Sequence, residues 1–339
     1  MTTTCVYIAN AESQDISVLA LDAAGGDLAE VQRYAAGGAV MPLAVSPDAR
    51  HLYASLRSEP YTVLSLSIDP ANGRLAEVGR APLPASMCWI STDRSGRFLL
   101  SASYGSSLVA VSPIDANGVA GAAHQVVPTE DKAHAVQVDP ANRHAFATCL
   151  GGDRIRQFRF DAAAGRLSDN DPPAWLARPG AGPRHFAFHP QAPRVYLLNE
   201  LDASIDVLSL DRSQGLLQTR QTVSALPPGF AAAQPWAADL HLTPDGRFLY
   251  ASERRSSSLA AFAVDAASGE LSPLGSVPTQ TQPRGFAITP DGRFLLAVGQ
   301  LSHRLTRYAI DPARGTLHKL GDQSVGRDPN WVEIVRLPA

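Results

Sequence analysis

The segment LHLTPDGRFLYASE, residues 240–253, contains two apolar runs separated by a short polar turn. The runs are of strand length, and the Pro-Asp-Gly-Arg sequence between them is typical of a reverse turn. Two strands joined by so short a connection form an antiparallel hairpin. How often this hairpin recurs along the chain decides the fold.

The hairpin recurs throughout the 339 residues at a nearly constant interval. Its other copies are LAVSPDARHLYAS (43–55), CWISTDRSGRFLLSAS (88–103), VQVDPANRHAFAT (136–148), FAFHPQAPRVYLLNE (186–200) and FAITPDGRFLLAV (286–298). Each turn ends in an arginine, and successive arginines are 46 to 53 residues apart: Arg50, Arg97, Arg143, Arg194, Arg247 and Arg293. A period of this length is the signature of a repeat architecture.

A second hairpin follows each copy of the first. In five copies an aspartate and a leucine stand six residues apart across the turn, as in Asp265 and Leu271. A sixth copy, LVAVSPIDANGVAGA (108–122), is shortened. Each repeat unit therefore contains four strands.

The two ends of the chain carry complementary parts of a further unit. The N-terminal segments VYIAN (6–10) and ISVLALDAAGGDLAEV (16–31) match strands two to four, and WVEIVRL (331–337) matches strand one. Radially repeated four-stranded units define a β-propeller, and pairing of the chain ends leaves no open sheet edge. We therefore expect an all-β, seven-bladed β-propeller forming a single domain over residues 1–339, with four antiparallel strands per blade.

Composition and charge limit the classes of function. The net charge is −3 and no block of Lys or Arg occurs, so we expect neither a nucleic-acid partner nor a membrane partner. The N-terminus has no basic stretch followed by an apolar stretch, and we expect a cytoplasmic protein. The three cysteines, Cys5, Cys88 and Cys149, are far apart and in apolar surroundings, which favours buried free thiols. Nothing in the sequence indicates the oligomeric state.

The segment GPRHFAFHP, residues 182–190, raises the question of a metal site. On a helix His185 and His189 would lie on one face, but the repeat predicts a strand here. Four residues of strand span about 13 Å, too far for one ion to bind both rings. We expect no metal ligands and no cofactor.

Residues that carry chemistry gather where the first strands of the blades begin. With the repeats aligned on their turn prolines, the residue before each first strand is Met41, Ser86, His134, Arg184, Ala238 or Arg284. The second strand of the blade that begins near Arg184 ends in Asn199 and Glu200, at the same face, and Asp239 is equivalent to His185. We therefore expect a cluster of His134, Arg184, His185, Glu200 and Arg284 around one mouth of the central channel. The turn arginines lie at the opposite face, and we assign them a structural role.

The residue types in this cluster indicate acid–base chemistry on an anion. Guanidinium groups bind phosphate or carboxylate with paired hydrogen bonds, so Arg184 and Arg284 favour an anionic ligand. A nearby glutamate or histidine can accept a proton from water. No GxSxG elbow and no glycine-rich phosphate loop is present.

The chain resembles the seven-bladed propeller 6-phosphogluconolactonases of bacteria. The resemblance rests on CWISTDRSGRFL, GPRHFAFHP, LLNELDASIDV, WAADLHLTPDGRFLYA, TQTQPRGFAITPDGRFLLA and GRDPNWVEI, and it extends from the first strand to the last. The family also includes fungal carboxy-muconate lactonising enzymes, whose channel mouth carries a histidine, two arginines and a glutamate. Matched motif to motif, these residues correspond to His134, Arg184, Arg284 and Glu200.

The resemblance implies a cofactor-free hydrolase acting on 6-phospho-D-glucono-1,5-lactone, a small anionic sugar lactone of the pentose phosphate pathway. Arg184, Arg284 and His185 would bind the substrate, and Glu200 or His134 would activate water. Because two guanidinium groups should lower the pKa of Glu200, a neutral His134 oriented by Glu200 is an equal candidate for the base. The alternatives are a cycloisomerase acting on carboxy-cis,cis-muconate and a non-enzymatic binding platform.

Overall fold

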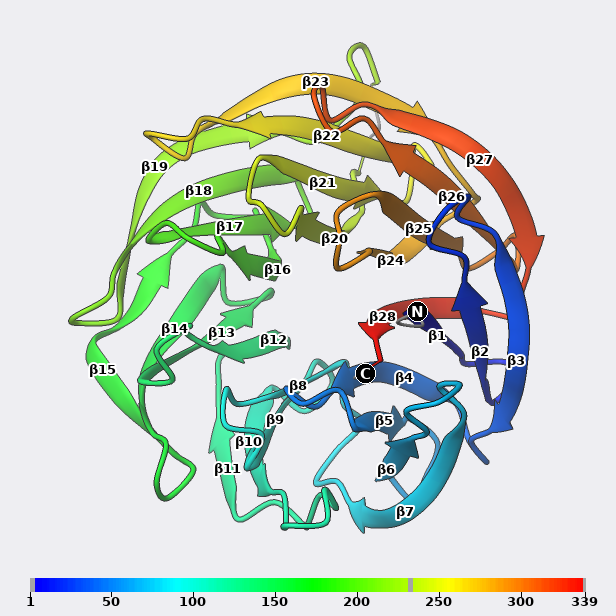
Figure 1. Cartoon of the computed structure of the whole chain (residues 1–339). Coiled ribbons are helices and arrows are strands. Elements are labelled where there is room, and N and C mark those ends of the chain that lie inside the picture. The colour runs from blue at the N-terminus through cyan, green and yellow to red at the C-terminus, as the bar shows by residue number, and fades with distance from the viewer. Residues whose placement is uncertain (1–3, 231–233, 338–339) are drawn as a thin grey trace.

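The computed structural model describes residues 4–230 and 234–337, and within them 28 strands form seven four-stranded sheets arranged in a ring (Figure 1). Neighbouring strands within each sheet are antiparallel. The all-β seven-bladed propeller expected from the repeat is therefore confirmed. No helix that could span a membrane occurs among the described residues.

Each blade runs from an innermost strand at the channel to an outermost strand at the rim. Blades 1 to 3 are β4 (Val40–Val45), β5 (His51–Leu56), β6 (Thr62–Ile68) and β7 (Leu75–Pro82); β8 (Trp89–Thr92), β9 (Phe98–Ser103), β10 (Leu108–Pro113) and β11 (Gln125–Pro128); and β12 (Ala133–Val138), β13 (His144–Cys149), β14 (Arg154–Asp161) and β15 (Arg166–Leu176).

Blades 4 to 6 follow the same order. They are β16 (Pro183–Phe188), β17 (Arg194–Asn199), β18 (Ser204–Asp211) and β19 (Leu216–Ser224); β20 (Ala237–Leu242), β21 (Phe248–Glu253), β22 (Ser258–Val264) and β23 (Leu271–Pro278); and β24 (Pro283–Ile288), β25 (Phe294–Gly299), β26 (Arg304–Ile310) and β27 (Leu317–Ser324).

Blade 7 is assembled from both ends of the chain. Its innermost strand is β28 (Pro329–Arg336), which pairs with β1 (Thr4–Asn10), followed by β2 (Asp15–Leu21) and β3 (Leu28–Ala35). This pairing confirms the predicted closure, and it gives β1 a partner strand on both sides.

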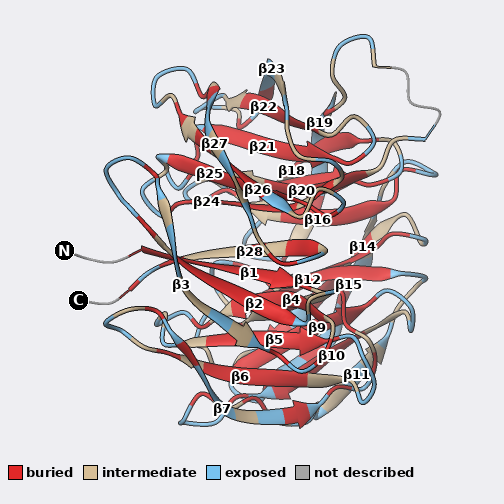
Figure 2. Cartoon of the chain, turned by 90° about the vertical axis from the view of Figure 1, so that its right-hand side faces the viewer, coloured by how far each residue is buried: buried red, intermediate tan, exposed pale blue. Residues whose placement is uncertain are grey.

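The hydrophobic core consists of layers between successive blades. One such layer joins Tyr7 and Val18 of blade 7 to Leu52 and Leu66 of blade 1. The second and third strands are buried along most of their length, whereas the outermost strands are mostly exposed or partly exposed (Figure 2). The channel walls are therefore held by packing on both sides of every sheet.

Side chains that recur in each repeat form hydrogen bonds between neighbouring blades. The guanidinium of Arg247 donates to the carbonyl of Pro312 in the next blade, and that of Arg143 donates to the carbonyl of Arg212. The hydroxyl of Tyr250 likewise donates to the carbonyl of Gly315 in the next blade. The structural role expected for these turn arginines is confirmed at both positions.

Candidate active site at one mouth of the channel

The innermost strands present their site residues through an irregularity in pairing. In β12, β16 and β24 the ladder to the second strand skips one residue, which is His134, Arg184 and Arg284 respectively. An unpaired residue of this kind forms a β-bulge, which re-aims its side chain. The sequence analysis placed these residues before their strands, whereas the structure places them inside the strands, at the bulges.

The bulges line a pocket of about 260 Å³ at the channel mouth. Its walls come from two structural positions that recur from blade to blade. The innermost strands and the residues preceding them give Met41, Cys88, His134, Arg184 and Arg284, and the residues directly after the second strands give Arg57, Tyr104, Glu200 and Arg254, with Trp236 completing the wall.

Arg184 is the most firmly held residue of the pocket, with only 1% of its surface exposed. Its Nε donates to Glu200 Oε2 at 2.8 Å, and its Nη1 donates to His185 Nε2 at 3.0 Å and to the carbonyl of Ala238. A guanidinium with this many fixed partners has one orientation. Arg184 therefore presents its remaining nitrogen, Nη2, in a defined direction.

Glu200 binds a second arginine through the same oxygen. The Nη2 of Arg254 donates to Glu200 Oε2 at 2.8 Å, and its Nε donates to the carbonyl of Trp236. The Arg254 guanidinium also lies 3.8 Å from the centre of the Trp236 ring, a cation–π contact. Burial raises the pKa of Glu200, but Arg184 and Arg254 outweigh burial and hold this pKa below its usual range.

The other two arginines of the pocket, Arg284 and Arg57, have no carboxylate partner among the described residues. Neither guanidinium forms an ion pair among the described residues; the carboxylate of the pocket is taken by Arg184 and Arg254. Arg57 makes one long contact, from Nε to the hydroxyl of Ser86 at 3.4 Å. Burial and the nearby charges of Arg184 and Arg57 lower the pKa of Arg284 to about 10.

His134 is buried beside these arginines and is neutral. Its Nδ1 has no hydrogen-bond partner within the described part of the chain. Burial, followed by the charge of Arg184, lowers the pKa of His134 well below 6.5. Its ring packs edge-on against Tyr104 and against His185, with centroid distances of 5.9 and 5.1 Å.

The pocket as a whole is strongly cationic. Four guanidinium groups face one carboxylate, so with His134 neutral the lining carries a formal charge of +3. An anion that enters exchanges bulk water for several charge-assisted hydrogen bonds. Within the described residues, no cluster of three or more His, Cys, Asp or Glu side chains could hold a metal ion.

The structure brings together four of the five residues expected at the mouth. His134, Arg184, Glu200 and Arg284 all line the pocket, whereas His185 lies behind Arg184 and does not. The expected orientation of His134 by Glu200 is not found: His134 Nδ1 has no hydrogen-bond partner in the described chain, and the two contacts of Glu200, both through Oε2, are to arginines. His185 lies inside strand β16, so the strand interpretation of the GPRHFAFHP segment is confirmed.

Three further positions differ from the sequence analysis. Cys88, not Ser86, lines the pocket in blade 2, because the turn of that blade lacks the proline used for the alignment. Asn199 is buried and donates to Ser204 and Asp206, so it supports the turn after β17. Asp239 binds His185 beneath the pocket.

Arg57, Tyr104 and Arg254 were missed by the sequence analysis. Each is the first residue after the second strand of its blade, the position that Glu200 occupies in blade 4. The repeat carries this signal, because the position of Glu200 has an equivalent in every blade and that equivalent is an arginine in blades 1 and 5.

Comparison with known proteins places the chain in a family. Residues 2–334 match the family model described as lactonase, 7-bladed beta-propeller. The chain therefore belongs to this lactonase propeller family.

Individual relatives are similar over most or all of the chain. A protein of Pectobacterium carotovorum named 6-phosphogluconolactonase is 45% identical over 83% of both chains, and one of Xenorhabdus nematophila with the same name is 41% identical over 98% of this chain and 99% of its own. The structure of the periplasmic gluconolactonase of Pseudomonas aeruginosa superposes with a TM-score of 0.93 at 30% identity, covering 99% of this chain and all of that one.

Proposed function

We propose that the protein hydrolyses 6-phospho-D-glucono-1,5-lactone to 6-phosphogluconate, a step of the pentose phosphate pathway. The observation that carries the proposal is the pocket charge of +3, which arises because Glu200 is the one carboxylate beside four guanidinium groups in the described lining. A phosphorylated lactone needs positive charge for its phosphate and a further donor for its reacting carbonyl. Relatives at 41 to 45% identity carry the name of this activity.

The phosphate binds to Arg284 and Arg57. Neither guanidinium has a carboxylate partner among the described residues, and a phosphate with two negative charges offsets two of the three net positive charges of the pocket. Arg57 is exposed at the rim and Arg284 is partly buried, so the phosphate enters from solvent without crossing the pocket.

The reacting carbonyl oxygen faces Arg184. The fixed contacts of Arg184 to Glu200, His185 and Ala238 hold its guanidinium before substrate arrives. A donor that needs no reorganisation stabilises the developing oxyanion most effectively.

His134 accepts the proton of the attacking water. Glu200 is a weak base because Arg184 and Arg254 lower its pKa, and its Oε2 is occupied by both arginines. Neither ring nitrogen of His134 has a hydrogen-bond partner in the described chain; Nδ1 is buried, so Nε2 takes the proton, and the neutral imidazole is present at physiological pH. Bound phosphate offsets the nearby arginine charges, which strengthens His134 as a base when substrate is present.

The protons balance over two steps. Water adds to the lactone carbonyl carbon while one of its protons moves to His134, giving a tetrahedral oxyanion beside Arg184. Collapse of this intermediate breaks the bond to the ring oxygen, and the proton on His134 passes to that oxygen. The product is an open-chain acid, which loses a proton to solvent.

The test is the rate of disappearance of freshly prepared 6-phosphogluconolactone, measured by coupling its product to 6-phosphogluconate dehydrogenase and corrected for spontaneous hydrolysis. Glucono-1,5-lactone and carboxy-cis,cis-muconate are the comparison substrates. We expect the phosphorylated lactone to give the highest kcat/KM. A higher value for carboxymuconate would assign the site to the cycloisomerase reaction instead, and no turnover of any of the three would reject both. The cytoplasmic location expected from the sequence stays a prediction.

A further inference from the structure

A continuous chain of hydrogen bonds runs away from the pocket beneath Arg184. The Nη1 of Arg184 donates to His185 Nε2, and the Nδ1 of His185 lies 2.8 Å from Asp239 Oδ1. The other carboxylate oxygen of Asp239 lies 3.1 Å from His241 Nε2. The chain joins the innermost strands of blades 4 and 5.

Chemistry fixes the position of the proton on His185. A guanidinium has only donors, so His185 Nε2 must accept, and Nδ1 must carry the hydrogen that is donated to Asp239. Burial and the charge of Arg184 lower the pKa of His185 to about 3, so its ring is neutral. His185 is therefore a fixed bridge between Arg184 and Asp239.

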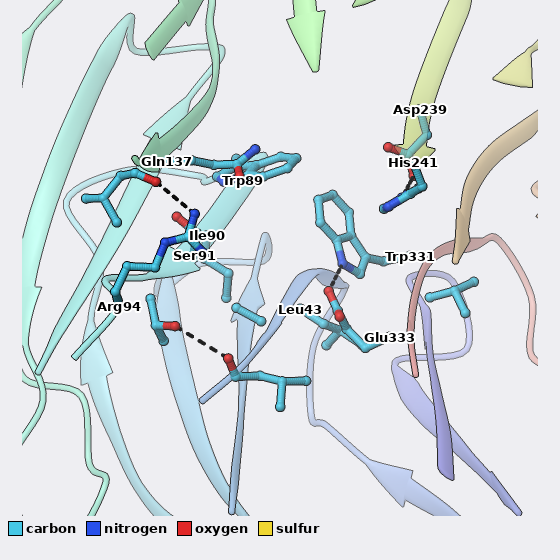
Figure 3. A pocket seen from close by; sticks show the side chains of 15 residues that line it. Leu43, Trp89, Ile90, Ser91, Arg94, Gln137, Asp239, His241, Trp331 and Glu333 are labelled. Carbon is cyan, nitrogen blue, oxygen red and sulfur yellow. Dashed lines mark hydrogen bonds and ion pairs between the residues drawn. The ribbon is translucent and has the colours of Figure 1, made fainter. Parts of the chain in front are cut away.

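Aromatic side chains bury the histidine of this bridge. The residue is 2% exposed, and its ring packs against Trp89 and Trp331 at centroid distances of 4.7 and 5.9 Å. Two further cavities, of about 330 and 340 Å³, border the bridge. Asp239 and His241 line both of them; Trp331 lines the first (Figure 3), and His185 lines the second. Asp239 is absent from the lining of the cationic pocket.

Asp239 is itself held in place by several donors. Its Oδ1 accepts from the backbone N–H of Leu240 at 3.0 Å as well as from His185. Its Oδ2 contacts His241, whose side chain is 40% exposed, and weakly accepts from the backbone N–H of Phe286 at 3.4 Å. These contacts hold the Asp239 carboxylate in one orientation. Its hydrogen bond with Nδ1 in turn holds the His185 ring.

We propose that Asp239 is a positioning residue for the reaction, which acts through His185 to fix the guanidinium of Arg184 toward the lactone carbonyl. Loss of the carboxylate frees His185 to carry its hydrogen on Nε2, where it would face the N–H groups of Arg184. Two opposed donors cannot form a hydrogen bond, so Arg184 would turn away from the oxyanion position. The proposal rests on the proposed function for its kinetic consequence.

The central experiment compares Asp239→Ala with Asp239→Asn. We expect Asp239→Ala to lower kcat about 10- to 100-fold, the usual cost of losing an orienting partner of a functional group. Asp239→Asn should retain most of kcat, because its amide oxygen can accept from Leu240 and His185 while its NH₂ faces His241. The KM for the phosphorylated lactone should stay within about threefold in both variants, since Arg284 and Arg57 are untouched.

Two measurements separate positioning from a general loss of structure. Calorimetric titration with 6-phosphogluconate should give wild-type stoichiometry for Asp239→Ala, which shows that the full protein concentration is folded. In a His185→Ala background the Asp239→Ala change should have no further effect on kcat, because the bridge is already broken. Asp239→Ser, whose hydroxyl ends one atom short of His185, replaces Asp239→Ala if the alanine variant does not fold.

The proposal is overturned if Asp239→Ala keeps kcat within twofold of the wild type, or if the Asp239 and His185 effects multiply. Nitrogen NMR of labelled histidines provides a readout without substrate: the wild type should show His185 as the neutral Nδ1–H form, and detection of the Nε2–H form would also overturn it. If the wild type turns over no lactone, the proposed function fails, and the NMR result still decides whether the bridge exists.

Discussion

At the scale of single residues, the partners of each arginine determine its role. Arg184 and Arg254 share Glu200 and are fixed by backbone carbonyls, so one of their two charges is compensated and both guanidinium groups are held in place. Arg284 and Arg57 have no such compensation in the described chain. The same side chain therefore serves as a rigid donor in one place and as an anion receptor in another.

The lack of a carboxylate partner for Arg284 leads to a prediction about substrate binding. Arg284→Ala should raise KM for 6-phosphogluconolactone about 10- to 150-fold, corresponding to about 1.5–3 kcal/mol for a charge-assisted contact. The KM for unphosphorylated gluconolactone and kcat for both lactones should change little. Steady-state kinetics with the two lactones measure this.

Arg247→Ala is the matched control, because Arg247 is a turn arginine bound to the carbonyl of Pro312. It should leave both kinetic constants unchanged. If Arg284→Ala instead lowers kcat equally for both lactones, Arg284 stabilises the oxyanion and the phosphate assignment is wrong.

The unpartnered imidazole of His134 leads to a prediction about pH. His134→Asn should lower kcat about 10²- to 10⁴-fold, the range expected for loss of a general base. Because burial and Arg184 lower the pKa of His134 well below 6.5, the free base predominates above this pH. Wild-type kcat/KM should therefore fall in acid as His134 is protonated, stay constant above pH 6.5, and fall again only in alkali, where Arg284 with its pKa of about 10 loses its charge.

The measurement is kcat/KM against pH after subtraction of spontaneous hydrolysis, which itself rises in alkali. Glu200→Gln serves for comparison. A wild-type profile that falls with an apparent pKa near 7 would contradict the environment found for His134, and a larger loss of kcat in Glu200→Gln with an unchanged fold would assign the base to Glu200.

At the scale of strands, the hairpins could be predicted but the bulges could not. Apolar runs around turns such as residues 243–247 determine strand pairing locally, and seven blades follow from counting them. Whether Arg184 pairs with the second strand or is skipped depends on the registration of β16 against β17, which alternation of residue types does not specify. His185 was expected in the pocket because it stands next to Arg184; in the structure Arg184 is the skipped residue, and His185 is paired with Leu198 and lies behind it.

Contacts between blades can be tested at the same scale. Tyr250 is fully buried, and its hydroxyl donates to the Gly315 carbonyl of the next blade at 2.8 Å. Tyr250→Phe leaves that carbonyl without its partner, so we expect a loss of about 1–2 kcal/mol in the free energy of unfolding. Kinetic constants should not change, because the contact is remote from the pocket residues. Urea unfolding followed by circular dichroism measures the effect. An unchanged urea midpoint would show that the hydroxyl contributes nothing to the contact between the blades.

At the scale of the whole molecule, closure of the ring links the chain ends to the active site. Strand β28 supplies the innermost strand of blade 7, and the next strand of that blade comes from the N-terminus (Figure 1). Trp331 of β28 also packs against Trp89 and His185 at the base of the pocket. Stability and site geometry therefore depend on the same strand.

A chain ending at Asp328 should fail to fold as a soluble monomer. It lacks the buried side chains of Val332, Val335 and Leu337 and exposes the edge of β1. At about 1.5–3 kcal/mol for each buried apolar side chain, the loss is about 5 kcal/mol or more, comparable with the whole stability of many proteins. An open edge also promotes aggregation.

Size-exclusion chromatography and thermal unfolding of the truncated protein test this expectation, with Arg336→Ala as the control, because Arg336 is an exposed residue of the same strand. The control should behave as the wild type. A synthetic peptide of residues 329–339 added during refolding should restore both the monomer and lactonase activity, because closure needs the strand and its pairing to β1, not the covalent bond to β27. A truncated chain that is monomeric, cooperative in unfolding and fully active without the peptide would show that the other six blades close the channel by themselves.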